Sequence, residues 1–149
     1  MLSSVAFPPT QVMPKISKSF DATSIASIES RGFIFAGSIA KDLSLPFILA
    51  RKPGKLPNET FIKDFDLEYG STSIEIQKNT KVEANQKIVI VDDLVATGGT
   101  AKAAAKLIEI SEGNVAAFIF VINLFDLGGN DDLLKNNYKV EKLIDFPGH

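Results

Sequence analysis

The residues best suited to chemistry lie in segment 91–100, which reads Val-Asp-Asp-Leu-Val-Ala-Thr-Gly-Gly-Thr. Its two glycines allow a tight turn that presents successive backbone N–H groups, and its two threonines add hydroxyl donors. The alanine- and lysine-rich run that follows has high helix propensity, so the positive end of a helix dipole would face the same turn. We therefore expect a phosphate-binding loop that contains Thr97, Gly98, Gly99 and Thr100.

Two adjacent carboxylates, Asp92 and Asp93, precede this loop. Because acids repel a phosphate, they fit a ligand that also brings hydroxyl groups to donate to them, or a bound Mg²⁺. A sugar with a phosphate at one end and vicinal hydroxyls at the other meets both requirements. A solvated acidic turn with an N-capping threonine would explain an isolated Gly-Gly-Thr, but it explains the whole segment less well.

Composition excludes several other kinds of site. The 149 residues contain no cysteine and one histidine, at position 149, which leaves no material for disulfides, thiolate zinc sites, histidine metal clusters or a Ser-His triad. Residues 32–38 have the glycine spacing of a P-loop but lack its lysine, and no G-x-G-x-x-G occurs. Any chemistry must therefore use carboxylates, lysines, arginines, hydroxyls and backbone amides.

Charge and hydropathy exclude several classes of partner. The formal net charge of −2 lacks the basic excess of a nucleic-acid-binding surface. The longest apolar run, 115–122, is far shorter than the ~20 residues needed to span a bilayer, and residues 1–9 carry no secretory signal pattern. We expect a cytoplasmic protein with neither nucleic-acid nor membrane partners.

Short apolar runs alternate with helical patterns, which predicts an α/β fold with a doubly wound, mainly parallel sheet flanked by helices. Continuous runs rich in β-branched residues are typical of strands that are buried on both faces. The expected strands are 25–28, 47–50, 88–91, 115–122 and 140–144, and the expected helices are 33–43 and 101–110.

Three further segments follow other patterns. Residues 1–20 carry prolines at a density that favours extended or turn structure over helix. Residues 52–66 are rich in proline and glycine with few periodic apolar positions, which predicts a long mobile loop. Alternation on either side of residues 70–71 predicts a small two-stranded excursion.

Polar loops follow three of the expected strands, at 29–32, 51–55 and 92–100. Because ligands of open α/β sheets bind at the carboxyl ends of the strands, we expect these loops to converge on one site. Taken alone, residues 51–55 are more simply interpreted as a solvated basic turn. Glu68, in the expected two-stranded excursion, is likewise more simply interpreted as an exposed strand carboxylate.

Segment 91–100 resembles the purine phosphoribosyltransferases, and among them those that act on adenine. The resemblance covers the chain from about residue 25 to its end, with the matching segments in the family's order. Segments 29–33, 51–57 and 91–100 are together highly specific. The matching segments are 29–33 (Glu-Ser-Arg-Gly-Phe), 51–57 (Arg-Lys-Pro-Gly-Lys-Leu-Pro), 67–70 (Leu-Glu-Tyr-Gly), 91–100, 122–129 (Ile-Asn-Leu-Phe-Asp-Leu-Gly-Gly) and 146–149 (Phe-Pro-Gly-His).

The resemblance implies a type I phosphoribosyltransferase fold and an enzyme of purine salvage. It would transfer the 5-phosphoribosyl group from phosphoribosyl pyrophosphate (PRPP) to adenine and give AMP and pyrophosphate. The family also implies Mg²⁺ and a homodimer. The alternatives are a PRPP-binding regulatory protein, a catalytically weakened paralogue, and a phosphoribosyltransferase for another purine.

The resemblance assigns roles to individual residues. Asp92 and Asp93 would contact the ribose hydroxyls, directly or through metal-bound water, with Mg²⁺ held through PRPP rather than by the chain itself. A cis peptide bond can join Glu29 to Ser30. The residues implied to hold the 5′-phosphate are Ala96, Thr97, Gly98, Gly99 and Thr100. The residues implied to face the pyrophosphate are Ser30, Arg31, Arg51, Lys52 and Lys55.

The base side of the site is less complete in this sequence. Glu68 looks like the group that exchanges a proton with the base nitrogen, and Tyr69 is assigned to substrate binding beside it. Residues 1–24 lack the Phe-Arg-Asp-rich segment that helps to form the family's hood over the base. We therefore expect a shortened or divergent hood in 1–24 and the phosphoribosyltransferase core domain in 25–149.

Overall fold

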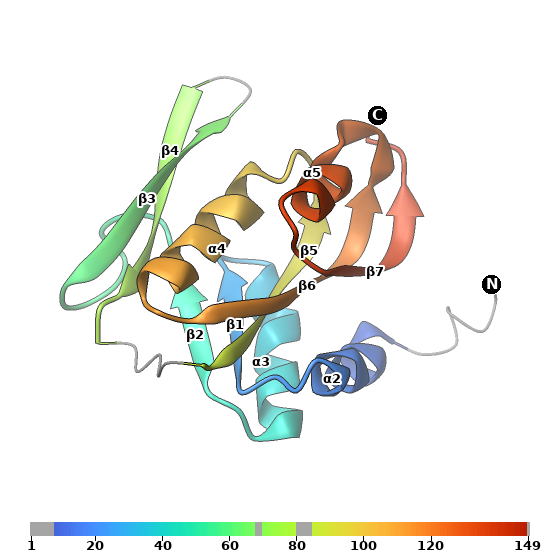
Figure 1. The fold of residues 1–149 in the computed structure, drawn as a ribbon, viewed down its shortest axis with the longest axis horizontal. Helices are drawn as coiled ribbons and strands as arrows, with labels where there is room; N and C mark the ends of the chain where they lie inside the picture. The colour runs from blue at the N-terminus through green and yellow to red at the C-terminus, as the bar shows by residue number, and fades with distance from the viewer. Residues whose placement is uncertain (1–7, 68–69, 80–84, 149) are drawn as a thin grey trace.

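The computed structural model describes residues 8–67, 70–79 and 85–148, and the centre of this part of the chain is a five-stranded parallel sheet (Figure 1). The strand order is β2-β1-β5-β6-β7, so the chain winds outward in one direction from β1 and in the other from β5. The strands are β1 (Ser24–Ile28), β2 (Phe47–Ala50), β5 (Lys87–Val95), β6 (Asn114–Leu124) and β7 (Val140–Phe146).

Helices cover both faces of this sheet (Figure 1). Val89 and Val91 of β5 pack in one cluster with α2 and α3, whereas Ile88 and Ile90 pack in the other with α4 and α5. This alternation confirms the predicted doubly wound class, and every strand and helix expected from the apolar pattern is present. The helices are α2 (Pro9–Ser19), α3 (Gly32–Leu43), α4 (Gly99–Ile110) and α5 (Gly129–Lys135).

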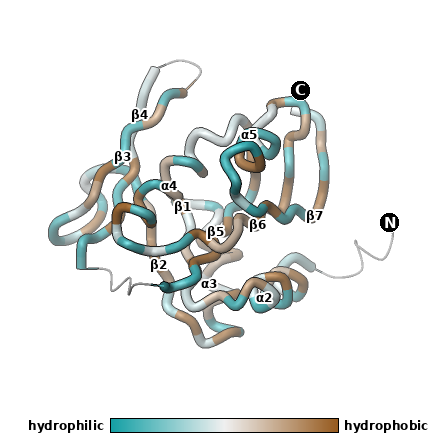
Figure 2. The backbone as a smooth tube through the Cα atoms, viewed as in Figure 1, coloured by the Kyte–Doolittle hydropathy of each residue, from teal (hydrophilic) through white to brown (hydrophobic). Residues whose placement is uncertain are grey.

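The prediction of extended structure near the N-terminus is wrong, because α2 is a helix. Pro9 stands in its first turn, where a backbone N–H has no helical partner to lose. The later Pro14 is accepted inside the helix, where it is buried together with the fully buried Met13. Figure 2 shows hydrophobic and hydrophilic stretches alternating along α2, as expected of a helix with one face on a sheet.

The predicted loop over 52–66 is too long, because strand β3 begins at Thr60. β3 (Thr60–Leu67) pairs with β4 (Gly70–Gln77) in an antiparallel two-stranded sheet, which confirms the predicted excursion. Phe61 and Phe65 pack against the core cluster that contains α4, so this small sheet lies beside that helix (Figure 1). Tertiary packing therefore fixes a segment whose own apolar pattern is weak.

Besides α2, two elements were not expected from the sequence, the 3-10 turn Phe125–Leu127 and the short helix α5 that follows it. Gly128, between them, has a φ of +80° and allows the abrupt change of direction. Within the described residues, no helix has both the length and the apolar character needed to cross a membrane.

Candidate active site

A cavity of about 230 Å³ lies at the carboxyl ends of β1 and β5, the two strands between which the winding direction reverses. This is the position at which open α/β sheets bind ligands. Two of the three expected polar loops, 29–32 and 92–100, meet at this cavity. The third, 51–55, contacts Glu29, which lines the cavity. The predicted site residues that line it are Ser30, Arg31, Asp92, Asp93, Ala96, Thr97, Gly98, Gly99 and Thr100.

The predicted phosphate loop is the turn between β5 and α4. Gly98 is the N-cap of α4 with a φ of +87°, a left-handed conformation that glycine adopts without strain. The first N–H groups of α4 have no partner within the helix, and this end of the helix lines the cavity. The turn therefore has the geometry of an anion-binding loop, while its binding of a phosphate stays a prediction.

Helix α5 contacts this loop through the Gly129 N–H, which donates to the carbonyl oxygen of Ala96, a role that sequence reasoning missed. Lys102 of α4 and Asp132 of α5 form an ion pair of 2.6 Å between Nζ and Oδ2. The glycine pair at 128–129, part of a segment that carries the family resemblance, is the signal that could have indicated close backbone contact here.

The two carboxylates at the end of β5 have different environments. Oδ1 of Asp92 accepts the backbone N–H of Asp93 at 2.8 Å. Burial, with the neighbouring Asp93 carboxyl adding to it, raises the pKa of Asp92 to about 8. Oδ2 of Asp93 instead lies 2.7 Å from Nε of the exposed Arg31. A cation or a hydroxyl donor placed at Asp92 would favour its charged form.

Gly32 makes room for this carboxylate, and sequence reasoning gave it no role in the site. A Cβ at position 32 would lie 2.6 Å from Oδ1 of Asp92 and 2.5 Å from Oγ of Ser27. That Ser27 hydroxyl donates to the carbonyl oxygen of Val91 at 2.6 Å and joins β1 to β5. A side chain at position 32 would therefore have to displace the Ser27 and Asp92 side chains from these positions.

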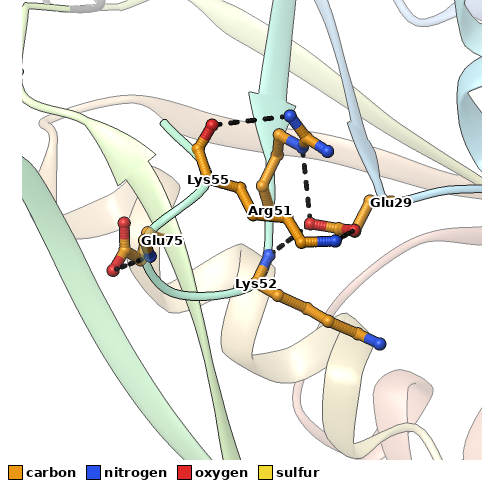
Figure 3. Close-up of polar contacts among 6 residues, drawn as sticks. Glu29, Arg51, Lys52, Lys55 and Glu75 are labelled. Carbon is orange, nitrogen blue, oxygen red and sulfur yellow. Dashed lines mark hydrogen bonds and ion pairs between the residues drawn. The ribbon is translucent and has the colours of Figure 1, made fainter. Parts of the chain in front are cut away.

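Arg51, Lys52 and Lys55 belong to a cationic turn (residues 51–55) that follows β2 and contacts Glu29 (Figure 3). Glu29 has a side chain only 7% exposed and follows β1, with a cis peptide bond to Ser30 as the resemblance implied. Its Oε1 accepts the backbone N–H of Lys52 at 2.5 Å, and its Oε2 lies 3.1 Å from Nζ of Lys55. Nε of Arg51 lies 3.4 Å from Oε1.

Neighbouring cations and a backbone hydrogen bond favour the charged form of Glu29. Burial alone would raise the pKa of Glu29, but the hydrogen bond from Lys52 and the nearby Lys55 and Arg51 charges outweigh burial and hold that pKa below its usual range. Among the described cations of the site, Arg31 lines the cavity, whereas the side chains of Arg51 and Lys55 contact Glu29, which is itself a lining residue. Glu29 was not predicted as a site residue, because nothing in its local sequence shows its distant partners.

Comparison with known proteins identifies the family. The phosphoribosyl transferase domain matches residues 12–148. The chain belongs to the phosphoribosyltransferase family. The adenine phosphoribosyltransferase of Pelagibacter ubique (strain HTCC1062) is 56% identical over 133 residues, which are 89% of this chain and 75% of that protein. The adenine phosphoribosyltransferase of Erythrobacter litoralis (strain HTCC2594) is 51% identical over 128 residues, 86% of this chain and 71% of that protein.

Solved structures of this family share the fold. The adenine phosphoribosyltransferase of Thermoanaerobacter pseudethanolicus superposes with a TM-score of 0.87 at 42% identity, over 93% of this chain and 78% of that one. The Saccharomyces cerevisiae adenine phosphoribosyltransferase, solved with adenine and an imino-altritol bisphosphate, gives a TM-score of 0.81 at 37% identity, over 95% of this chain and 84% of that one.

Glu68 and Tyr69 lie outside the described residues, between the end of β3 and the start of β4. The end of β3 does reach the phosphate loop, because a Cβ on Gly99 would lie 3.3 Å from the carbonyl oxygen of Asp66. The end of β3 in this phosphoribosyltransferase therefore lies beside the phosphate loop, and the roles of Glu68 and Tyr69 stay predictions.

The acid pair fits Mg²⁺ that is shared with a substrate. Mg²⁺ takes oxygen ligands and is usually held by one or two carboxylates together with water and substrate phosphates. Within the described ranges, no group of three or more His, Cys, Asp or Glu side chains is placed to hold a metal ion. Asp92 and Asp93 would therefore need oxygens from the substrate to complete a Mg²⁺ site.

Proposed function

We propose that the protein transfers the 5-phosphoribosyl group of PRPP to adenine, giving AMP and pyrophosphate. The observation that carries this proposal is the cavity between β1 and β5, where a carboxylate pair adjoins a glycine-rich turn at a helix N-terminus. The identity of 56% to an adenine phosphoribosyltransferase over 133 residues supports adenine as the base. The reaction serves purine salvage.

Segment 91–100 would hold the ribose phosphate at both ends. Backbone N–H groups and hydroxyls of residues 96–100 would bind the 5′-phosphate, and Asp92 and Asp93 would accept hydrogen bonds from the ribose hydroxyls. Fixing both ends orients the anomeric carbon toward the incoming nitrogen of the base, and orientation of this kind lowers the barrier.

Cations would stabilise the leaving group. When the C1–O bond breaks, the electron pair goes to the pyrophosphate oxygen and the ribose ring becomes electron-poor, so positive charge near the pyrophosphate favours the transition state. A bound Mg²⁺ would neutralise further charge on the pyrophosphate oxygens. Arg31 is the cation of this set that already lines the cavity. We assign Ser30, Arg31, Arg51, Lys52 and Lys55 to the pyrophosphate.

The small sheet would complete the base side. Glu68 would take the proton that the attacking base nitrogen gives up as its bond to the anomeric carbon forms, and Tyr69 would line the same place. The contact of β3 with the phosphate loop supports this assignment.

We also propose a cytoplasmic homodimer, as the family resemblance implies. Several large apolar side chains are strongly exposed, among them Ile34 at 72%, Phe125 at 55% and Phe146 at 54%, and they offer surface for a second copy. Sedimentation equilibrium of the purified chain would decide the oligomeric state.

The direct test is AMP formation by the 149-residue chain from adenine, PRPP and Mg²⁺, with hypoxanthine and guanine assayed in parallel. We expect AMP and pyrophosphate in equal amounts with adenine, and much slower reaction with the other two bases. Turnover of another purine in preference to adenine would move the proposal to that base. PRPP binding with no turnover of any purine would support the regulatory alternative instead.

A further inference from the structure

The cationic turn carries three positive side chains within five residues. Its backbone is nevertheless hydrogen-bonded to two carboxylates, those of Glu29 and Glu75 (Figure 3). Three neighbouring cations repel one another, and Gly54 with its φ of +80° adds backbone freedom. A turn of this kind needs external contacts to keep one shape. Figure 3 shows Glu29 on one side of the turn and Glu75 on the other, with the Lys52 side chain pointing away from both.

Glu75 belongs to β4, outside the cavity lining, and is itself only 6% exposed. Its backbone forms a two-way bridge with Arg51: the Arg51 N–H donates to the Glu75 carbonyl at 2.9 Å, and the Glu75 N–H donates to the Arg51 carbonyl at 2.7 Å. Its side-chain Oε1 accepts the N–H of Gly54 at 3.2 Å. Glu75 therefore holds the beginning of the turn with its backbone and the apex with its side chain.

Glu29 and Glu75 contact different parts of the turn. Glu29 accepts the N–H of Lys52 and contacts the Lys55 ammonium, whereas Glu75 accepts the N–H of Gly54 from the opposite side. A carboxylate is rarely buried without charged or hydrogen-bonded partners, because leaving water is costly. Among the described residues, the Glu75 side chain has its hydrogen-bond partner in the turn, so this burial serves the shape of the turn.

We propose that Glu75 is a positioning residue for the pyrophosphate, acting through the backbone of the cationic turn. The inference rests on the proposed function, in which Arg51 and Lys55 bind the leaving group. A preformed turn binds an anion without first paying to order its cations. Because Glu75 touches the turn and not the phosphate loop, its loss weakens pyrophosphate and PRPP binding and leaves adenine binding unchanged.

Two nearly isosteric variants separate hydrogen bonding from packing at this position. Glu75→Gln keeps an oxygen that accepts the Gly54 N–H, whereas Glu75→Met fills the same space without an acceptor. The matched control is Glu59→Gln, which changes an acid just before β3 whose side chain is 85% exposed and pairs with Lys78. The measurements are KM for PRPP and for adenine, inhibition by pyrophosphate, and hydrogen exchange at the Gly54 amide.

We expect Glu75→Met to raise the KM for PRPP and the inhibition constant of pyrophosphate about tenfold, the effect of losing one hydrogen bond to a buried charged group. The KM for adenine stays within about twofold, because the Glu75 side-chain hydrogen bond in the described part of the chain goes to the turn. Exchange at Gly54 becomes faster in Glu75→Met only. Glu75→Gln and Glu59→Gln match the wild type in all four measurements.

Several outcomes would overturn the role of Glu75: equal effects of Gln and Met, equal increases in both KM values, or no effect of Met. If the wild type made no AMP, the proposed function itself would fail. Calorimetric titration of pyrophosphate into the wild type and both variants would still test the role of Glu75. Pyrophosphate binding that is equal in all three proteins, or absent from all three, contradicts the inference.

Discussion

Gly129 donates its backbone N–H to the carbonyl oxygen of Ala96 at 2.9 Å, so the first turn of α5 rests directly on the phosphate loop. A Cβ at position 129 would clash with that same oxygen and would lie 2.7 Å from the backbone nitrogen of Gly98. The shape of the loop between β5 and α4 is therefore set partly by a glycine from another region of the chain.

Gly129→Ala is expected to displace the phosphate loop, because its added methyl group has no space on the Ala96 side. We predict an increase of at least tenfold in the KM for PRPP, about 1.4 kcal/mol of lost binding, with a smaller change for adenine. Steady-state kinetics checks this.

The control for that variant is Gly128→Ala, which adds the same methyl group where no described atom lies within 4 Å of the Cβ position. Its φ of +80° makes alanine strained there, so we expect a loss of about 1 kcal/mol in unfolding free energy but a normal KM for PRPP. A normal KM for PRPP in Gly129→Ala would show that α5 does not shape the loop.

The pH dependence of stability should report the burial of Asp92. Its pKa is raised from 3.8 to about 8, so between these values the folded state keeps a proton that the unfolded state loses. The unfolding free energy contributed by this group is therefore fully present below the lower value and is lost as pH rises toward the higher one. Urea titrations at pH 5 and pH 8 measure the loss.

Asp92→Asn cannot ionise and is expected to lose less stability over the same pH range. We predict that the difference between the variant and the wild type changes by more than about 1.4 kcal/mol between the two pH values, the equivalent of one pKa unit. Parallel pH profiles for the two proteins would mean that Asp92 is ionised in the folded state at both values.

Removing both carboxylates should separate function from folding. Asp92→Asn combined with Asp93→Asn takes away charge-assisted hydrogen bonds to the ribose hydroxyls, and two such bonds correspond to roughly a 100-fold loss in kcat/KM for PRPP. At pH 8 the double variant should be no less stable than the wild type, because the buried charge is gone. Equal losses of melting temperature and activity would argue for a structural role of the pair.

Helix α2 should contribute to stability and not to PRPP binding. Met13 is fully buried against α3 and the sheet, and truncation of such a side chain typically costs about 2–5 kcal/mol. We expect Met13→Ala to lower the unfolding free energy by that amount with an unchanged KM for PRPP. Gln11→Ala, on the exposed side of the same helix, is the control and should change neither quantity.

The central sheet could be predicted because its strands carry their own signal. Ile88 to Val91 is a continuous β-branched run, and the adjacent Asp-Asp and Gly-Gly pairs mark where the strand ends and the loop begins. The same local reasoning failed at α2, because three prolines predicted extended structure. The amphipathic pattern of this segment forms a helix once Met13 is buried in the fold. It also failed at Thr60, where pairing with β4 fixes the strand.

The chemical residues of the cavity could be predicted, whereas the residues that hold them could not. Asp92 and the loop at 96–100 lie together in sequence, so their types and spacing are visible at once. Glu29 and Glu75 hold the cationic turn from 23 and 21 positions away. Such contacts depend on strand order and register, which the sequence does not display. The raised pKa of Asp92 likewise follows from burial that only the folded chain creates.

The account depends most on the claim that the cavity between β1 and β5 binds a sugar phosphate. A crystal structure of the 149-residue chain with AMP tests it directly. We predict the 5′-phosphate within hydrogen-bond distance of the backbone N–H groups of residues 97–100 and the ribose hydroxyls on Asp92 and Asp93. AMP bound elsewhere, or with its phosphate away from this turn, would contradict the account.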